Sequence, residues 1–252
     1  MSTVAFFHAH PDDEAIFTGG TMLRLKMLGH RVVLILATGG ELGIGPAGPG
    51  ELLALRLAEV ERSARILGVD SVIPLGYHDS GMLGDPANDL SGSFWSADIA
   101  SAAESLASSL SSESVDSLVV YDPNGIYGHP DHVKCHRVGV HAAQLADISS
   151  TYEMTVDREY LHFVETHLVT EAALGGDLGL AGSRVGYSTA EIELQVDVRT
   201  VIDAKRAAMA CHTSQLPEDA PVFLLEPERF IEVYGWEWYV RTGTPGALET
   251  LR

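Results

Sequence analysis

The chain has 252 residues, 46% of them apolar, and its 35 acidic and 16 basic side chains give a net charge of −19. This length and apolar content suffice to bury one large core. A surface this acidic repels phosphate backbones and anionic lipid, which argues against nucleic-acid binding and against a membrane-surface role.

Strand and helix patterns alternate through the first 150 residues. Runs rich in β-branched residues and leucine predict strands, and these lie at residues 4–7, 31–37, 71–75 and 117–121. Apolar residues at helical spacing predict helices, and these lie at residues 14–28, 53–67, 97–110 and from His132 onward. The alternation predicts an α/β fold of Rossmann-like type, with a mostly parallel sheet and helices on both faces.

The pattern beyond residue 150 is less regular. We expect strands at 160–165, 191–198 and 230–241, a helix at 199–212, and a loop at the glycine-rich stretch 175–182. We see no linker that requires a second domain. We therefore predict one domain over residues 1–252. Residues 1–150 form its Rossmann-like half, and residues 151–252 form a smaller mixed portion that completes the sheet and the pocket.

Unusual polar residues follow the ends of all four strands predicted in the first half. They are His10, Asp12 and Asp13 after the first strand, Glu41 after the second, residues 78–80 after the third, and residues 122–132 after the fourth. Ligands of such sheets bind beyond the carboxyl ends of the strands. We therefore expect these side chains to meet at one edge of the sheet.

The residue types at this edge suit a metal ion. A catalytic zinc site commonly uses three His or carboxylate ligands and leaves one position for water. His10 and Asp13 are three residues apart at a predicted helix start, so they can share a face and one ion. A third ligand can come from His129 or His132. Asp12 can then contact the bound water and take its proton.

Each of these segments also has a purely structural explanation. An Asp-Asp pair at a helix start often serves as an N-cap and as a charge that favours the helix dipole. A histidine before a helix is often only a polar cap. Because both segments are expected at one edge of the sheet, metal binding is favoured over a purely structural role.

Together, HAHPDDE (residues 8–14) and YGHPDH (127–132) resemble the LmbE-like or PIG-L zinc deacetylases, which remove acetyl groups from N-acetylglucosaminyl substrates. The resemblance covers most of the chain and includes ATGGE (37–41), YHDSGM (77–82), YDPNG (121–125) and KRAAMACHTSQ (205–215). YHDSGM and YDPNG are most similar to the actinobacterial branch. That branch includes the mycothiol-pathway deacetylase and the mycothiol S-conjugate amidase.

The resemblance implies a metal centre and a base. His10, Asp13 and His132 are similar to the family's zinc ligands, and Asp12 is similar to its general base. The implied cofactor is Zn²⁺, although two histidines and one aspartate also suit Fe²⁺.

The resemblance also implies roles in handling the substrate. His129 is similar to the histidine that, as an imidazolium, stabilises the oxyanion and protonates the leaving amine, with Asp131 orienting it and stabilising its charge. Tyr127 is similar to a tyrosine that polarises the substrate carbonyl. Three further residues match sugar-binding positions of the family, namely Glu41, Arg56 and Asp79.

The implied reaction is hydrolysis of an N-acetyl group from an N-acetylglucosaminyl-type glycoside, a small molecule. Two alternatives remain within the family: an amidase acting on a mycothiol S-conjugate, and a tailoring deacetylase of an antibiotic glycoside. We expect contacts to the aglycone from residues 42–50, 83–95 and 175–188. The sequence leaves open whether the chain forms a homo-oligomer.

A different class of enzyme is suggested by residues 43–48, which spell G-x-G-x-x-G. This motif is typical of dinucleotide sites, so an NAD(P)-binding oxidoreductase is the rival interpretation. The motif does not directly follow the first strand, and Pro46 removes a backbone donor. We expect a loop over the active site here instead.

The two cysteines, Cys135 and Cys211, are too few for a disulfide framework. The N-terminus lacks the basic and apolar stretches of a signal peptide. We therefore expect a cytoplasmic protein. We expect Cys135 to be a buried small residue and His212 to form a structural hydrogen bond.

Overall fold

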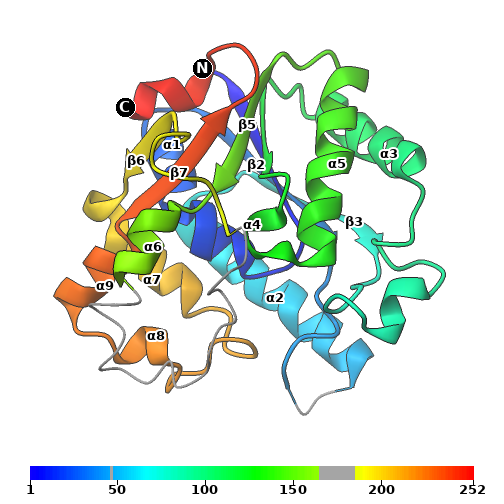
Figure 1. Ribbon diagram of the computed structural model, residues 1–252, viewed down its shortest axis with the longest axis horizontal. Coiled ribbons are helices and arrows are strands. Elements are labelled where there is room, and N and C mark those ends of the chain that lie inside the picture. The colour runs from blue at the N-terminus through cyan, green and yellow to red at the C-terminus, as the bar shows by residue number, and fades with distance from the viewer. Residues whose placement is uncertain (46–47, 165–184) are drawn as a thin grey trace.

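The computed structural model describes residues 1–45, 48–164 and 185–252 (Figure 1). In this part of the chain one sheet has the strand order β3-β2-β1-β4-β5-β7-β6. Its strands are β1 (Thr3–His8), β2 (Arg31–Thr38), β3 (Ser71–Tyr77), β4 (Ser117–Tyr121), β5 (Ser150–Thr155), β6 (Leu194–Asp197) and β7 (Trp236–Arg241). β1 to β5 run parallel, and β7 is antiparallel to both β5 and β6. The predicted fold class is confirmed.

Helices follow the strands and cover the sheet (Figure 1). The longer helices are α1 (Gly19–Met27), α2 (Pro49–Leu67), α3 (Ile99–Ser112), α5 (Pro130–Leu145), α7 (Ile202–Met209) and α9 (Pro227–Tyr234). The shorter ones are η1 (Glu14–Thr18), η2 (Pro86–Asp89), α4 (Gly125–Gly128), α6 (Arg158–Val164), η4 (Arg199–Val201), α8 (Pro221–Leu224) and η5 (Ala247–Leu251). α3 packs on α5, while α1, α2 and α7 pack on one another. Among the described residues, no helix has both the length and the apolar character needed to cross a membrane.

The central strands are buried on both faces because helices cover both sides of the sheet. In β2, seven consecutive residues after Arg31 are buried, as the continuous apolar run predicts. The chain order reverses between β1 and β4, since β2 and β3 lie on one side of β1 and β5 lies beyond β4. Such a reversal opens a crevice at the carboxyl ends of the strands. The segments that follow β1 and β4 both begin there.

The start of α5 is fixed by its sequence. Pro130 stands in the first turn, where its missing N–H costs nothing. The side chain of His129 caps the helix by accepting a backbone N–H. Gly139 lets α5 lie close to β4, because a Cβ there would be 2.3 Å from Val120 Cγ1. These features hold the YGHPDH segment against the end of the sheet.

The predictions for the C-terminal portion were partly wrong. Residues 160–165 were expected to be a strand, but α6 is a helix, capped by Asp157 Oδ1, which accepts the Tyr160 N–H at 3.1 Å. Only the second half of 230–241 is a strand, because Pro227 begins α9. The helix expected at 199–212 is shorter and consists of η4 followed by α7. Of the strand expected at 191–198, only β6 forms. β5 was missed altogether. Short aromatic and apolar runs show no periodicity that separates helix from strand.

The expected loop at 175–182 lies outside the described residues. The described strands before and after residue 151 join one sheet. The division of the chain into two parts of one domain stays a prediction.

Candidate active site

The best candidate for a metal centre is a buried cluster of two histidines and one aspartate. Asp13 Oδ2 lies 3.3 Å from His10 Nδ1 and 3.3 Å from His132 Nε2. Ligand atoms of one tetrahedral zinc ion, each about 2.0–2.1 Å from the metal, stand roughly 3.3 Å apart. Each of these two distances therefore matches the separation of two ligands on a single ion.

The second nitrogen of each histidine is already engaged. His132 Nδ1 donates to the Gly125 carbonyl at 3.2 Å, which leaves a lone pair on Nε2. That Nε2 is buried and has no hydrogen-bond partner among the described residues. His10 Nε2 donates to Asp131 Oδ2 at 3.2 Å, which leaves a lone pair on Nδ1. Such outer contacts are typical of histidines that ligate metals.

Asp13 is held ionised in this cluster. Its Oδ2 accepts the His10 N–H at 2.9 Å and the Tyr121 hydroxyl at 2.7 Å. Although burial opposes ionisation, His132 and His10 hold the pKa of Asp13 well below its usual range. His10 and Asp13 were predicted to share a helical face. They meet instead across a tight turn, because the first helical segment, the π-helix η1, begins only at Glu14.

Other ligand sets lie close by. Atoms of His10, His129 and His132 come within 4.8 Å of one another, and so do atoms of His10, Asp79 and Asp131. In the first set, however, His129 Nδ1 accepts the Asp131 N–H at 3.1 Å. In the neutral ring the proton then sits on Nε2, so His129 presents a donor rather than a lone pair. The set of His10, Asp13 and His132 suits a metal better.

His129 was expected to act as an imidazolium. Burial, with His10 and His132 close by, lowers the pKa of His129 to about 3. This shift favours the neutral ring, whose Nε2–H is a donor, and the imidazolium role of His129 stays a prediction. Asp131 was expected to orient His129 through its charge, but its carboxylate lies against His10 and accepts the Ser80 N–H at 3.0 Å. It is the backbone N–H of Asp131 that orients His129.

Asp12 lies beside the cluster in an unusual conformation. Its φ is +115°, a value rarely adopted by residues other than glycine. Its Oδ2 accepts a hydrogen bond from Arg56 Nη2 at 3.0 Å. Burial raises the pKa of Asp12 to about 7, with Arg56 opposing the shift. A carboxylate with a pKa near neutrality is suited to accept and return a proton.

A pocket of about 380 Å³ opens over these residues. Seven of the predicted site residues line it, namely His10, Asp12, Asp13, Arg56, Asp79, Tyr127 and His129. His132 lies fully buried beneath. Glu41 does not line the pocket but contacts residues beside it. Its Oε1 accepts the Asp79 N–H at 3.1 Å and contacts His78 Nδ1 at 2.9 Å.

Two of the predicted sugar-binding residues also hold the protein backbone. Arg56 is buried and donates to the carbonyls of Gly40, at 2.5 Å, and Pro11. Asp79 accepts the Leu42 N–H at 3.2 Å. Both side chains therefore shape the loops around the pocket as well as facing it.

Some residues of the site were not predicted from the sequence pattern. Tyr121 was expected only as a strand residue, yet its ring stacks on His132 with centroids 4.2 Å apart. Gln215 joins the pocket wall and pairs with both backbone groups of Ile44, at 3.0 and 2.8 Å. His212 forms the expected structural hydrogen bond, to Glu14 Oε1 at 2.7 Å. Cys135 is buried, as expected.

The glycine motif at 43–48 does not match a dinucleotide site. It follows β2 rather than β1, and it leads into α2 at Pro49. Gly43 and Ile44 line the pocket instead, as expected for a loop over the active site. Pro46 and Ala47 lie outside the described residues.

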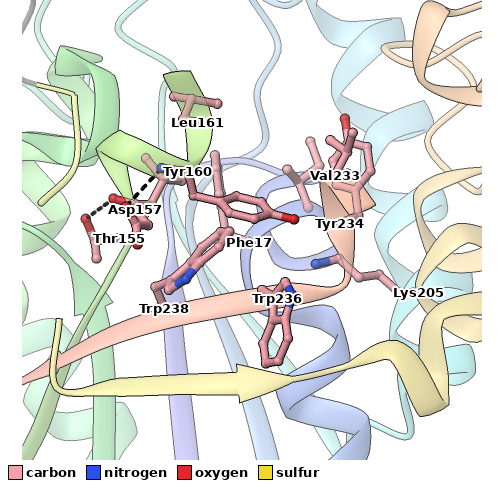
Figure 2. Close-up of a pocket in the computed structure, with 12 residues that line it drawn as sticks. Phe17, Thr155, Asp157, Tyr160, Leu161, Lys205, Val233, Tyr234, Trp236 and Trp238 are labelled. Atoms are coloured by element: carbon pink, nitrogen blue, oxygen red, sulfur yellow. Dashed lines mark hydrogen bonds between the residues drawn. The ribbon is translucent and has the colours of Figure 1, made fainter. Parts of the chain in front are cut away.

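A second cavity of about 170 Å³ is lined in part by Phe17 (Figure 2). The ring of Phe17 meets that of His132 edge-on, with centroids 6.4 Å apart. Figure 2 shows aromatic rings from Phe17, Tyr160, Trp236 and Trp238 around it. Its charged groups are paired within the protein, because Lys205 Nζ lies 2.7 Å from Glu237 Oε1 and Asp157 accepts the Thr189 hydroxyl at 2.9 Å. This cavity offers apolar surface rather than reacting groups.

A doubly wound α/β sheet with a His/Asp cluster where the strand order reverses is an arrangement that suits a metal-dependent hydrolase. The chain belongs to the PIG-L family, since residues 5–143 match the family model described as GlcNAc-PI de-N-acetylase. The family is one of metal-dependent deacetylases, and this chain is a deacetylase of that family.

A full-length relative supports this assignment. The chain is 34% identical over 263 residues to the 1D-myo-inositol 2-acetamido-2-deoxy-alpha-D-glucopyranoside deacetylase of Streptomyces avermitilis. The match covers 92% of this chain and 89% of that protein.

Solved structures share the fold. The N,N'-diacetylchitobiose deacetylase of Pyrococcus horikoshii matches with a TM-score of 0.65 and 24% identity, over 96% of this chain and 84% of that one. The 4-carboxy-2-hydroxymuconate hydratase GalB of Pseudomonas putida matches with a TM-score of 0.63 and 16% identity, over 98% of each chain. Because a hydratase shares this fold, the likeness in structure does not by itself define the reaction.

Proposed function

We propose that this chain is a zinc-dependent N-deacetylase that hydrolyses the acetamide of an N-acetylglucosaminyl glycoside. The observation that carries the proposal is the position of Asp13 Oδ2, 3.3 Å from both His10 Nδ1 and His132 Nε2. The first candidate substrate is N-acetylglucosamine linked to inositol, because the relative from Streptomyces avermitilis is named for that compound.

His10, Asp13 and His132 would hold the ion. When bound, zinc supplies a Lewis acid and lowers the pKa of a water to about 7. Iron(II) suits the same ligands, and metal analysis distinguishes the two. The contacts of His10 with Asp131 and of His132 with Gly125 would fix the tautomer of each neutral ring, so that its other nitrogen can ligate the ion.

Asp12 would act as the general base. Its carboxylate lines the pocket beside the ligands, and burial raises its pKa to about 7. It can therefore take a proton from the attacking water and later deliver it to the leaving amine. Arg56 fixes the orientation of this carboxylate through the hydrogen bond at 3.0 Å.

His129 and Tyr127 would stabilise the charge that develops on the substrate carbonyl oxygen. The Nε2–H of His129 is a donor fixed by the backbone contact at Nδ1. Tyr127 lines the pocket, and because a tyrosine hydroxyl has a pKa of about 10, it stays protonated near neutral pH and can also donate. Removing one donor of this kind commonly lowers kcat by about 10²–10³-fold.

The sugar would bind at the polar wall of the pocket. Arg56 and Asp79 line this wall, and Glu41 holds the Asp79 loop in place. All three would thus serve sugar binding, two directly and one through its neighbour.

A second candidate substrate class follows from the pocket mouth. Leu42, Ile44 and Met82 line the pocket while remaining 42%, 80% and 57% exposed. Apolar side chains left open at a pocket commonly contact an apolar part of the ligand. A glycoside with an apolar aglycone, such as a glycosidic antibiotic, or a thiol conjugate cleaved at its amide would use this surface.

The test is release of primary amine by zinc-loaded protein. The panel contains the inositol glycoside of N-acetylglucosamine, its octyl glycoside and a mycothiol S-conjugate. We expect release that stops with a chelator and returns with zinc, and the ratio of kcat/KM values ranks the substrate classes. Protein that holds one zinc ion per chain yet releases no amine from any member would contradict the proposed function.

A further inference from the structure

The strained backbone of Asp12 requires an explanation. A residue other than glycine at positive φ is strained, and this conformation persists only where its surroundings impose it. Asp12 has φ +115°. Its carbonyl accepts the N–H groups of Ala15 and Ile16, at 3.1 and 3.2 Å, so it begins η1. The backbone N–H of Asp12 donates a hydrogen bond to a side chain of the same segment.

That side chain is Glu14. The Asp12 N–H donates to Glu14 Oε2 at 2.9 Å. Glu14 Oε1 accepts the Ser63 hydroxyl at 2.6 Å and faces His212 Nε2 at 2.7 Å. Each carboxylate oxygen of Glu14 is therefore bound, and one of them holds the strained residue.

The side chains that hold the Asp12 N–H in place come from three parts of the fold. Glu14 belongs to η1, Ser63 to α2, and His212 to the segment after α7. All three side chains are fully buried. Burying a charged pair is costly, and replacing such a pair by apolar residues is often neutral or stabilising. Stability alone is therefore a weak reason for this arrangement.

Glu14 does not occur among the described residues that line the pocket. It contacts the reacting groups only through a neighbour, and Asp12 is the neighbour whose backbone N–H it binds. Arg56 holds the same residue from the other side, through its carboxylate and the preceding carbonyl. Asp12 is thus fixed at its backbone by Glu14 and at its side chain by Arg56.

We propose that Glu14, anchored by Ser63 and His212, is a positioning residue that holds Asp12 in its strained conformation and so aims its carboxylate at the reacting water. This inference rests on the proposed role of Asp12 as the base. Displacing a reacting group by about 1 Å can cost 10²-fold in rate.

The test uses Glu14→Asp, which keeps the charge but shortens the side chain by one methylene. The shorter carboxylate cannot reach the Asp12 N–H and both anchors at once. We expect kcat to fall on the order of 10²-fold, with KM changed less than about threefold and one zinc ion still bound per chain. Glu14→Gln, whose amide oxygen can still accept the Asp12 N–H, should recover much of that loss.

A matched control exists in β7. Glu237 is as buried as Glu14, pairs with Lys205, and accepts the N–H groups of Gly20 and Thr21 at 2.8 Å. Glu237→Asp shortens an equally buried carboxylate away from the metal cluster. We expect it to lower the melting temperature and leave kcat within about twofold. An equal fall in kcat in both variants would overturn the inference, since general loosening would then explain it.

A double-mutant cycle separates positioning from structure. If Glu14 acts only through Asp12, then Glu14→Asp has no further effect on kcat once Asp12→Asn is present. Independent, additive losses would refute the positioning role. If Asp12→Asn alone leaves turnover unchanged, the proposed role of Asp12 as the base is refuted. This result differs from additive losses, which refute only the positioning role of Glu14. Should Glu14→Asp not fold, Ser63→Ala removes one anchor more gently, and it should lower kcat several-fold with the same dependence on Asp12.

Discussion

Tyr121 is the residue through which the metal cluster is tested most specifically, because Phe is a nearly isosteric replacement. Its hydroxyl donates to Asp13 Oδ2 at 2.7 Å and accepts the Ala9 N–H at 3.2 Å. Burial raises the pKa of Tyr121 well above its usual value, so the hydroxyl remains a donor. Tyr121→Phe therefore removes one fixed hydrogen bond to a proposed ligand while keeping the ring.

The magnitude follows from the type of contact. Loss of a hydrogen bond to a metal-ligating group typically costs 10- to 100-fold in metal affinity, which is about 1.4–2.7 kcal/mol. The buried Ala9 N–H also loses its partner, and this costs about 1–3 kcal/mol of stability. We expect weaker zinc binding, a lower melting temperature, and kcat at saturating zinc close to that of the wild type.

The assay is competition for zinc against a chromophoric chelator. Tyr152→Phe is the control, since Tyr152 is equally buried and its hydroxyl accepts the Gly246 N–H at 2.7 Å, away from the cluster. It should lose stability without losing zinc affinity. Zinc affinity of Tyr121→Phe within twofold of the wild type would refute the assignment of Asp13 as a ligand supported by Tyr121.

Three further predictions concern other parts of the account. His129→Gln should lower kcat by about 10²–10³-fold with zinc retained, measured by amine release; a change in KM alone would contradict the oxyanion role. Met82→Ser should raise KM for the octyl glycoside more than for the inositol glycoside, and equal effects on both would argue against an apolar aglycone site. Burial raises the pKa of Glu153 to about 7, above its unfolded value of about 4.3. Because the folded state then binds the proton more tightly, the contribution of Glu153 to stability is full below about pH 4.3 and is lost as pH rises through 7. Urea unfolding of wild type and Glu153→Gln should show the wild type losing more stability between pH 5 and pH 8, and parallel pH profiles would contradict this.

The sequence predicted the location of the site because strand patterns reveal where strands end. His10 and Asp13 follow β1, and His132 follows β4, and the structure brings these three residues together at the switch point. The roles of ligand and base came from the family resemblance. Spacing alone could not choose between His129 and His132, and the contact between His129 Nδ1 and a backbone N–H now favours His132 as the ligand.

The supporting contacts could not be predicted because they join residues far apart in the chain. Glu14 and His212 are 198 positions apart, and Tyr121 and Asp13 are 108 apart. Each looks ordinary in its own segment, one at a helix start and another in a buried strand. The positive φ of Asp12 likewise has no signature in the local sequence. The fold creates all of these features only when the elements pack.

The measurement that tests the central claim most directly is anomalous diffraction at the zinc edge from crystals of zinc-loaded protein. We predict one peak about 2.0–2.2 Å from His10 Nδ1, Asp13 Oδ2 and His132 Nε2, with Asp12 and His129 beside it and outside the coordination sphere. A peak ligated by His129, or one held by His10, Asp79 and Asp131, would contradict the account.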